Sequence, residues 1–115
     1  MSFKLTAEVL EDIDEALFGS ALNFGRSAAH RYRELISLSI REIVSDPELI
    51  GSKEEHGLQR GIRLYHLRYS RKRAAVDGLI VKRPRHFIVY RITDSGLVEI
   101  VRMLHESMDL KRRFD

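Results

Sequence analysis

Several side chains in this sequence are of the types that can cleave RNA. They are His86, His105, Arg63, Arg85, Arg91 and Arg102. Attack by a ribose 2′-hydroxyl needs a base to remove its proton, an acid for the leaving oxygen and cations to hold the phosphate. An imidazole can act as base or acid near neutral pH, and guanidinium groups bind phosphate oxygens. One open, phosphate-sized hollow lined by both histidines and several arginines would therefore indicate an endoribonuclease.

The same residue types also have structural roles, which the local sequence favours. His86 follows Arg85 at the start of a β-rich run, where a histidine commonly bonds to backbone within a sheet. Tyr90 lies among apolar residues, so we expect its ring in the core and its hydroxyl bonded. Residues 105–107 include no Phe, Tyr or Trp to stack on a base, and a carboxylate at Glu106 would repel phosphate. The sequence therefore predicts binding rather than catalysis, with no catalytic residue.

Apart from Arg63, these residues lie on or next to two predicted strands joined by a tight turn. Residues 86–91 are rich in β-branched and aromatic side chains, as strands are. In residues 94–96 an Asp can bond its own backbone and a Gly can adopt positive φ, which predicts a turn. Residues 98–104 form the returning strand. Ser107 is placed to cap a short basic helix over residues 108–114.

The first part of the chain predicts a strand and two helices. Residues 3–5 alternate in the manner of a short strand. Thr6 caps a helix that ends at Gly25, because Gly commonly follows the last helical turn. The expected buried stripe of this helix contains Leu10, Ile13, Leu17, Ala21 and Phe24. A second helix spans residues 27–45 and ends before Pro47, and the short link forces the two helices antiparallel.

The middle of the chain connects this helical hairpin to the final strands. Residues 48–60 are polar and rich in glycine, which predicts a loop, and residues 62–69 predict one more strand. Residues 70–83 predict a bent extension past the sheet. We therefore expect one α+β domain over residues 1–115. It has a short N-terminal strand, an antiparallel helical hairpin packed on a three-stranded antiparallel β-meander, and a short C-terminal helix.

Positive charge is concentrated in one part of the chain. The 115 residues carry a net charge of +3. Residues 59–91 hold ten Lys or Arg against a single acid, Asp77, whereas residues 1–58 hold six against eleven. Such a basic surface attracts a polyanion or an acidic protein segment. A basic surface that contacts only water remains the alternative.

Composition also disfavours several kinds of protein. Because the sequence has no cysteine, a disulfide scaffold, a thiolate zinc site and a cysteine nucleophile are excluded. The five histidines form no metal-ligand pattern and no glycine-rich phosphate loop occurs, so we expect no metal and no cofactor. No apolar run is long enough for a membrane helix, and the N-terminus lacks an apolar signal segment. We therefore expect a cytoplasmic protein.

The final hairpin resembles a known family. It fits the pattern R-H-x-I-x-Y-R followed by V-x-I-x-R-x-L-H-x-x-M-D. The matching positions are Arg85, His86, Ile88, Tyr90, Arg91, Val98, Ile100, Arg102, Leu104, His105, Met108 and Asp109. This pattern resembles the C-terminal half of ParE-like toxins, a branch of the RelE/ParE superfamily of type II toxin–antitoxin systems.

The N-terminal half extends this resemblance over nearly the whole chain. Further family patterns are matched at residues 9–13, at Phe24, Gly25, Ala29 and Tyr32, and at residues 47–51 and 61–63. The sequence departs from the family at residues 70–83, which are longer than the usual tight link between these strands.

The resemblance implies one of two activities. ParE-like toxins bind DNA gyrase and block replication, and a ParD-like antitoxin with an acidic, flexible tail neutralises them. RelE-like toxins are ribosome-dependent mRNA endoribonucleases. We prefer the ParE-like activity, because residues 105–107 lack the Tyr that RelE-like enzymes usually carry there. The RelE-like activity is the alternative, and a plain nucleic-acid-binding module that uses residues 59–91 is a third interpretation.

Two sets of binding residues are expected from this assignment. The predicted antitoxin contacts are Arg63, Arg85, Phe87, Arg91 and Arg102. The predicted target-facing residues are His105, Asp109, Lys111, Arg112 and Arg113. Acidic flanks on an amphipathic antitoxin helix would pair with the first set as that helix enters a groove.

Overall fold

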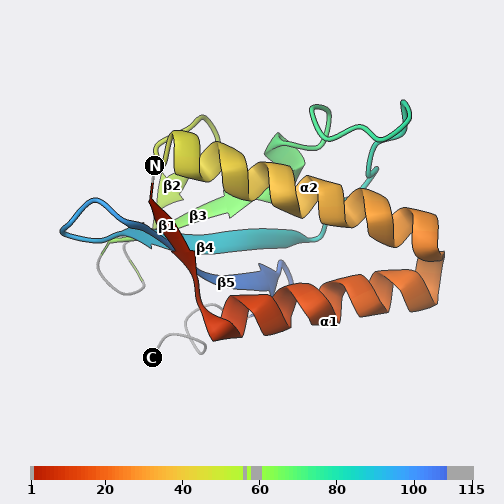
Figure 1. The fold of residues 1–115 in the computed structure, drawn as a ribbon, viewed down its shortest axis with the longest axis horizontal. Helices are drawn as coiled ribbons and strands as arrows, with labels where there is room; N and C mark the ends of the chain where they lie inside the picture. The colour runs from red at the N-terminus through yellow and green to blue at the C-terminus, as the bar shows by residue number, and fades with distance from the viewer. Residues whose placement is uncertain (1, 56, 58–60, 109–115) are drawn as a thin grey trace.

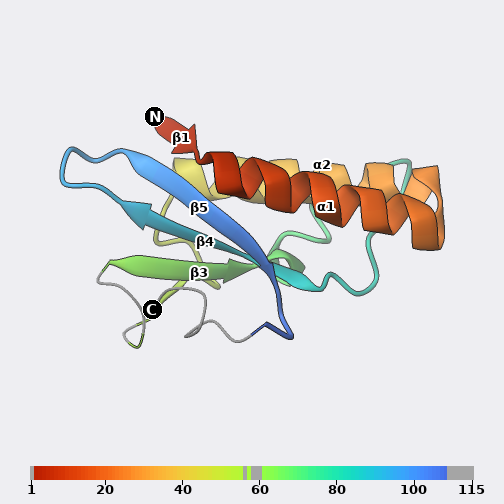
Figure 2. The same ribbon diagram turned by 90° about the horizontal axis from the view of Figure 1, so that it is seen from below.

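A mixed sheet and a helical hairpin form the two layers of the protein. In this computed structural model, which describes residues 2–55, 57 and 61–108, one five-stranded sheet has the order β1-β5-β4-β3-β2. The strands are β1 (Phe3–Leu5), β2 (Lys53–Glu54), β3 (Ile62–His66), β4 (His86–Ile92) and β5 (Val98–His105). Helices α1 (Ala7–Phe24) and α2 (Arg26–Ser45) cover one face of the sheet (Figure 2). The predicted α+β class is confirmed.

The helical hairpin forms as the sequence predicted. Thr6 caps α1, with its Oγ1 accepting a hydrogen bond from the N–H of Val9 at 3.1 Å. Gly25 alone separates the two helices, and its φ of 92° is a conformation that residues with a side chain rarely adopt. The helices therefore turn back on each other within one residue and run antiparallel (Figure 1).

The predicted buried stripe of α1 is partly wrong. Leu10 is 49% exposed and Phe24 is 77% exposed. Val9 is buried instead, and Ile13 and Leu17 pack against the core as predicted. Phe24 lies in the last turn of α1, which extends beyond the strands (Figure 1), and so it has no sheet beneath it.

The sheet contains more strands than the predicted meander. Strands β3, β4 and β5 are antiparallel neighbours as expected, and His86 pairs directly with His105. In addition, β1 pairs in parallel with β5, and β2 forms within the stretch predicted as a loop. The strand predicted to reach residue 69 ends at His66, and a 3₁₀ turn (Leu67–Tyr69) follows. Apart from Met108, the predicted C-terminal helix lies outside the described residues.

Beyond the end of the short β1, residues at the start of α1 form hydrogen bonds with the backbone along the edge of β5. The backbone N–H of Thr6 donates to the carbonyl of Ile100 at 3.2 Å. One carboxylate oxygen of Asp12 then accepts the N–H of Met103 at 3.0 Å. The same carboxylate accepts hydrogen bonds from Nε and Nη2 of Arg102, at 2.7 and 2.9 Å. The hairpin is thereby fixed to the sheet through side chains as well as through apolar packing.

Apolar clusters lie on both faces of the sheet. The cluster under the helices includes Leu35, Ile43, Tyr65 and Tyr90, and the hydroxyl of Tyr90 bonds to Ser52 as predicted for a core tyrosine. The opposite face carries a smaller cluster formed by Ile62, Leu64, Val89 and Leu104, with Phe87 against it. Among the described residues, no helix is long and apolar enough to cross a bilayer.

Candidate functional site

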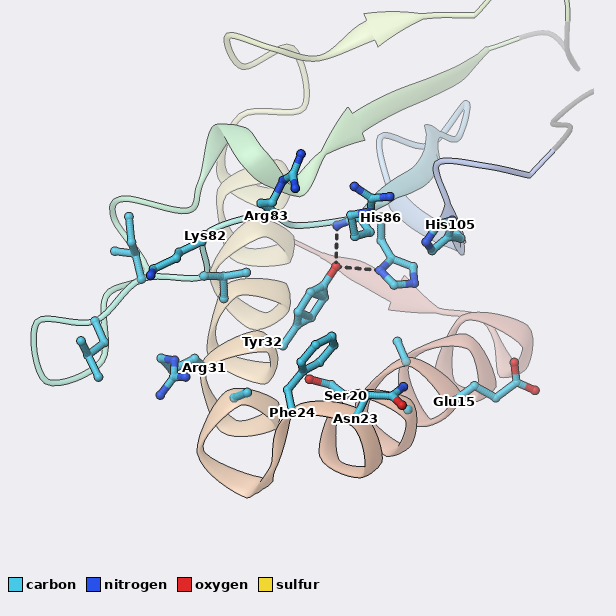
Figure 3. A pocket seen from close by; sticks show the side chains of 17 residues that line it. Glu15, Ser20, Asn23, Phe24, Arg31, Tyr32, Lys82, Arg83, His86 and His105 are labelled. Carbon is cyan, nitrogen blue, oxygen red and sulfur yellow. Dashed lines mark hydrogen bonds between the residues drawn. The ribbon is translucent and has the colours of Figure 1, made fainter.

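An open groove of about 1090 Å³ lies between the helical hairpin and the segment that leads into β4. Its helical wall is made partly of small side chains, among them Ala16, Gly19 and Ala28. Its second wall is the chain from residue 79 to residue 83, which begins with Leu79, Ile80 and Val81. The cationic lining residues are Arg31, Lys82, Arg83 and Arg85. Figure 3 shows Arg31, Lys82 and Arg83 among the side chains that line the groove. The groove thus combines an apolar interior with a positive rim.

Tyr32 joins the two walls of this groove. Its hydroxyl accepts the backbone N–H of Arg85 at 3.0 Å, and it lies 2.7 Å from Nδ1 of His86 (Figure 3). With Nδ1 of His86 unprotonated, the hydroxyl donates its proton to that nitrogen while its oxygen accepts from Arg85. Burial raises the pKa of Tyr32 to about 12, so the hydroxyl keeps this proton at neutral pH.

His86 is a neutral imidazole in this position. Burial, followed by the neighbouring imidazole of His105, lowers the pKa of His86 to about 4. The two rings meet edge to face with centroids 5.3 Å apart, as expected for a directly paired position on β4 and β5. Nδ1 of His105 accepts the N–H of Ser107 at 3.1 Å. Both histidines thus have structural partners.

Glu106 links three strands at the same end of the sheet. Its carboxylate lies 2.9 Å from Nε2 of His66 and 3.2 Å from Nε of Arg85. The hydrogen bond from His66 lowers the pKa of Glu106, and Arg85 contributes to the same shift. Part of the positive charge of Arg85 is therefore balanced, and its side chain is held at the rim of the groove.

Residues 70–83, which are longer than the link expected from the family resemblance, form a hairpin that supplies the second wall. Val76 and Leu79 exchange backbone hydrogen bonds across Asp77 and Gly78, whose φ values of 51° and 79° fit a tight I′-type turn. Arg73, at the base of this hairpin, binds the carboxylate of Glu42 on α2 with two nitrogens, at 2.7 and 3.0 Å. The predicted extension past the sheet is therefore anchored to α2.

The predicted antitoxin contacts do not lie together. Of these residues, only Arg85 lines the groove. Arg63 donates to Ser52 at 2.9 Å, and Arg91 pairs with Glu99 at 2.6 Å, both away from the groove. Phe87 belongs to the cluster on the opposite face of the sheet, and Arg102 is bound to Asp12. Their contact with an antitoxin stays a prediction.

The predicted target-facing residues are described only in part. His105 lines the groove beside His86. The others, Asp109, Lys111, Arg112 and Arg113, lie outside the described residues. Sequence reasoning did not select Arg31, Lys82, Arg83 or Tyr32 as site residues. A signal for two of them was available, because Lys82, Arg83 and Arg85 are crowded around Pro84 immediately before a strand.

The arrangement meets only part of what a nuclease requires. Both histidines and several cations do line one open groove. Its volume of about 1090 Å³ and its apolar helical wall, however, suit a peptide segment better than a phosphate. Across residues 2–55, 57 and 61–108, no cluster of side chains has the composition of a metal site.

Comparisons with known proteins agree with this fold. A family model described as "ParE toxin of type II toxin-antitoxin system, parDE" matches residues 3–110. A solved structure, "Chromosomal ParDE TA system from P. aeruginosa", aligns with a TM-score of 0.67 at 14% sequence identity. That alignment covers 91% of this chain and 95% of the other, and at this identity it shows a shared fold. No curated protein sequence matches the chain.

Proposed function

Because the chain belongs to the ParE toxin family of type II toxin–antitoxin systems, we propose that it arrests growth by binding DNA gyrase in the cytoplasm. The family match over residues 3–110 is the observation that carries this proposal. A ParD-like antitoxin neutralises the toxin by binding it. No bond is cleaved in either interaction.

The groove is the proposed site for the antitoxin. An amphipathic antitoxin segment would set its apolar side chains against Ala16, Ala28 and Leu79, which line the groove. Acidic side chains on its flanks would then reach Lys82 and Arg83 at the rim. Charge attraction of this kind speeds association and selects against basic partners. The acidic tail expected of a ParD-like antitoxin has the matching chemistry.

The state of His86 supports a protein that binds rather than cleaves. A general base works best when its pKa is close to the working pH. The pKa of His86, at about 4, is far below that range, and its Nδ1 already accepts the Tyr32 proton. Arg85, the nearest guanidinium in sequence, is partly engaged by Glu106. These groups hold the groove together and have little capacity left for proton transfer.

A supercoiling assay tests the proposed function. The purified chain is added to DNA gyrase, relaxed plasmid and ATP, with no ribosomes present. We expect the supercoiled product to disappear as toxin is added, and to return when the protein encoded beside the toxin gene is added in equal amount. A type I topoisomerase serves as the control and should be unaffected. Normal supercoiling at a large excess of toxin would reject gyrase as the target.

A second candidate function, a RelE-like ribosome-dependent endoribonuclease, is favoured by one observation. The rings of His86 and His105 meet edge to face, with centroids 5.3 Å apart, in the same groove as Arg83 and Arg85. If this site cleaved mRNA, ribosomes programmed with a defined message would yield codon-linked cuts, and His105→Ala would abolish them. Growth arrest that persists in the His105→Ala variant, with uncut mRNA, would exclude this function.

A further inference from the structure

The side of α1 that faces away from the sheet carries apolar and acidic side chains together. Val9 and Ile13 mark the side that packs on the core. At roughly 100° per residue, Phe18 and Leu22 lie on the opposite side of the helix. Their side chains are 68% and 70% exposed. The outer α1 face is defined by Glu11, Asp14, Glu15, Phe18 and Leu22.

The acidic residues of the outer α1 face are not used to hold the fold. Within the part of the chain that the structure describes, Glu11, Asp14 and Glu15 form no ion pair. Asp12, on the same helix, instead points inward and binds Arg102. The helix therefore separates one structural acid from three that are open to a partner.

The apolar pair is more than scattered surface hydrophobicity. Single exposed apolar side chains are common on proteins and need no explanation. Phe18 and Leu22, however, are one helical turn apart, and three acids surround them in the same sector of α1. An aromatic anchor at the centre, surrounded by a polar rim, is the usual arrangement of a protein–protein interface.

We propose that the outer α1 face is the surface that docks on the toxin's target, at a positively charged, DNA-binding surface of gyrase. This inference rests on the proposed function. An enzyme that holds DNA presents cations along the DNA path. Glu11, Asp14 and Glu15 complement such a surface in charge, and Phe18 with Leu22 would fill an apolar depression between its cations.

Two other occupants fit the charge of this face less well. A second copy of this chain, paired about a two-fold axis, would bring Glu11, Asp14 and Glu15 against their own counterparts. An acidic antitoxin tail would meet the same repulsion, whereas the cationic groove attracts it. Glu15 also lines the groove, so the two surfaces meet along α1. An antitoxin bound in the groove therefore lies at the edge of the target surface and blocks the approach of a large enzyme.

Surface variants that leave the core intact test this inference. Phe18→Ser with Leu22→Ser removes the apolar anchors, and Glu11→Gln, Asp14→Asn and Glu15→Gln together remove the charge with little change of shape. For each variant, we expect the toxin concentration needed for half-inhibition of supercoiling to rise by about tenfold or more. Affinity for the antitoxin, measured by calorimetry, should change by less than about threefold for the apolar variant.

Matched controls separate docking from folding. Ile50→Ser alters another apolar side chain, 94% exposed, that lines neither surface, and it should leave both measurements unchanged. Leu79→Ser alters the groove wall and should weaken antitoxin binding while supercoiling inhibition stays intact. Thermal melting checks that each variant is folded. The charge variant should also lose most of the salt dependence of inhibition, which a purely structural role of the acids would not affect.

The outcomes distinguish this inference from the proposed function. If the unaltered chain inhibits gyrase and both outer-face variants inhibit it equally well, the outer α1 face is not the target surface. If the unaltered chain fails to inhibit gyrase, the proposed function fails and this inference fails with it. A dimer in sedimentation that Phe18→Ser with Leu22→Ser dissociates, with inhibition unchanged, would assign the face to a second copy and overturn the inference.

Discussion

The groove and the outer α1 face lie on the same helical hairpin but are built differently. In the groove, Tyr32 bonds to both Arg85 and His86, and Glu106 holds Arg85 in turn. On the outer α1 face, the side chains of Phe18 and Leu22 are exposed to solvent. The groove therefore exists only in the folded protein, whereas the outer face needs little more than an intact helix α1. Side chains held in place before binding lower the entropy lost on association.

The contrast is sharpest between two aspartates on one helix. Asp12 accepts hydrogen bonds from Nε and Nη2 of Arg102 and from the N–H of Met103. Asp14 is exposed, and no ion pair of the described residues includes it. Two residues of sequence thus separate an acid that stabilises the fold from one that is free for a partner.

The largest expected effect is on stability, from Asp12→Ala. This change leaves the partly buried guanidinium of Arg102 and the N–H of Met103 without their partner, and removing one member of a buried pair is costly. We expect a loss of about 3 kcal/mol in the free energy of unfolding, measured by urea denaturation. Asp14→Ala is the matched control and should change stability by less than about 0.5 kcal/mol. Equal effects of the two substitutions would contradict the division of α1 into structural and open acids.

The next largest expected effect is on the affinity of the groove for the antitoxin. Lys82→Glu with Arg83→Glu reverses the charge of the rim, so we expect antitoxin affinity to fall about thirtyfold by calorimetry. Inhibition of gyrase should persist, because the outer α1 face is unchanged. Lys53→Glu with Lys72→Glu makes the same change in net charge outside the groove and should alter affinity by less than about threefold. A similar loss in both double variants would show that net charge, and not the groove, attracts the antitoxin.

Local patterns predicted the elements of the fold well. The β4–β5 hairpin follows from the β-forming residues 86–91, the Asp-Ser-Gly turn and the returning strand. The helical hairpin follows from Thr6 and Gly25, whose roles as a cap and as a joint are properties of single residues. The parallel pairing of β1 with β5 and the short β2 were missed, because partners distant in sequence leave no local signal.

The groove was less predictable, because its parts come together only in the folded chain. Helix α1 and the wall beginning at Leu79 are far apart in sequence. Several cations of the basic stretch were expected to be available, yet Arg73 is bound by Glu42 and Arg91 by Glu99. The second of these pairs follows from the β4–β5 register, in which Arg91 lies opposite Glu99. The first joins α2 to a hairpin, and no periodicity in the sequence indicates it.

A smaller effect is expected where the groove walls are joined. Tyr32→Phe removes the hydroxyl that accepts the N–H of Arg85 and donates to His86, and it leaves both groups without this partner. We expect a loss of about 1.5 kcal/mol in the free energy of unfolding and weaker antitoxin binding. Tyr69→Phe removes a hydroxyl bonded to the exposed Arg68 and should have almost no effect. Unchanged antitoxin affinity in Tyr32→Phe would show that this bond does not organise the groove.

The smallest expected effect is a pH dependence of stability that comes from His86 in the groove. The pKa of His86 is about 4 in the folded protein, against an ordinary value of 6.5. Between these two values the unfolded chain binds a proton that the folded chain does not, so stability decreases as pH falls through this window. Below about pH 4 both states are protonated, and the contribution of His86 no longer changes. Glu42 and Glu99 have lowered pKa values and lose their contributions only below 4.5.

Urea denaturation at pH 7 and pH 5 therefore isolates this imidazole from the carboxylates. From pH 7 to pH 5, we expect the free energy of unfolding to fall by about 1 kcal/mol more in the unaltered chain than in His86→Gln. This figure allows for the partial exposure of the imidazole ring. Glutamine keeps a polar side chain at this position but does not titrate. The outer α1 face offers a comparison, since Phe18→Ser changes no titrating group and should leave the pH-dependent loss of stability unaltered. If His86→Gln and the unaltered chain lose the same stability, protonation of His86 does not destabilise the folded protein.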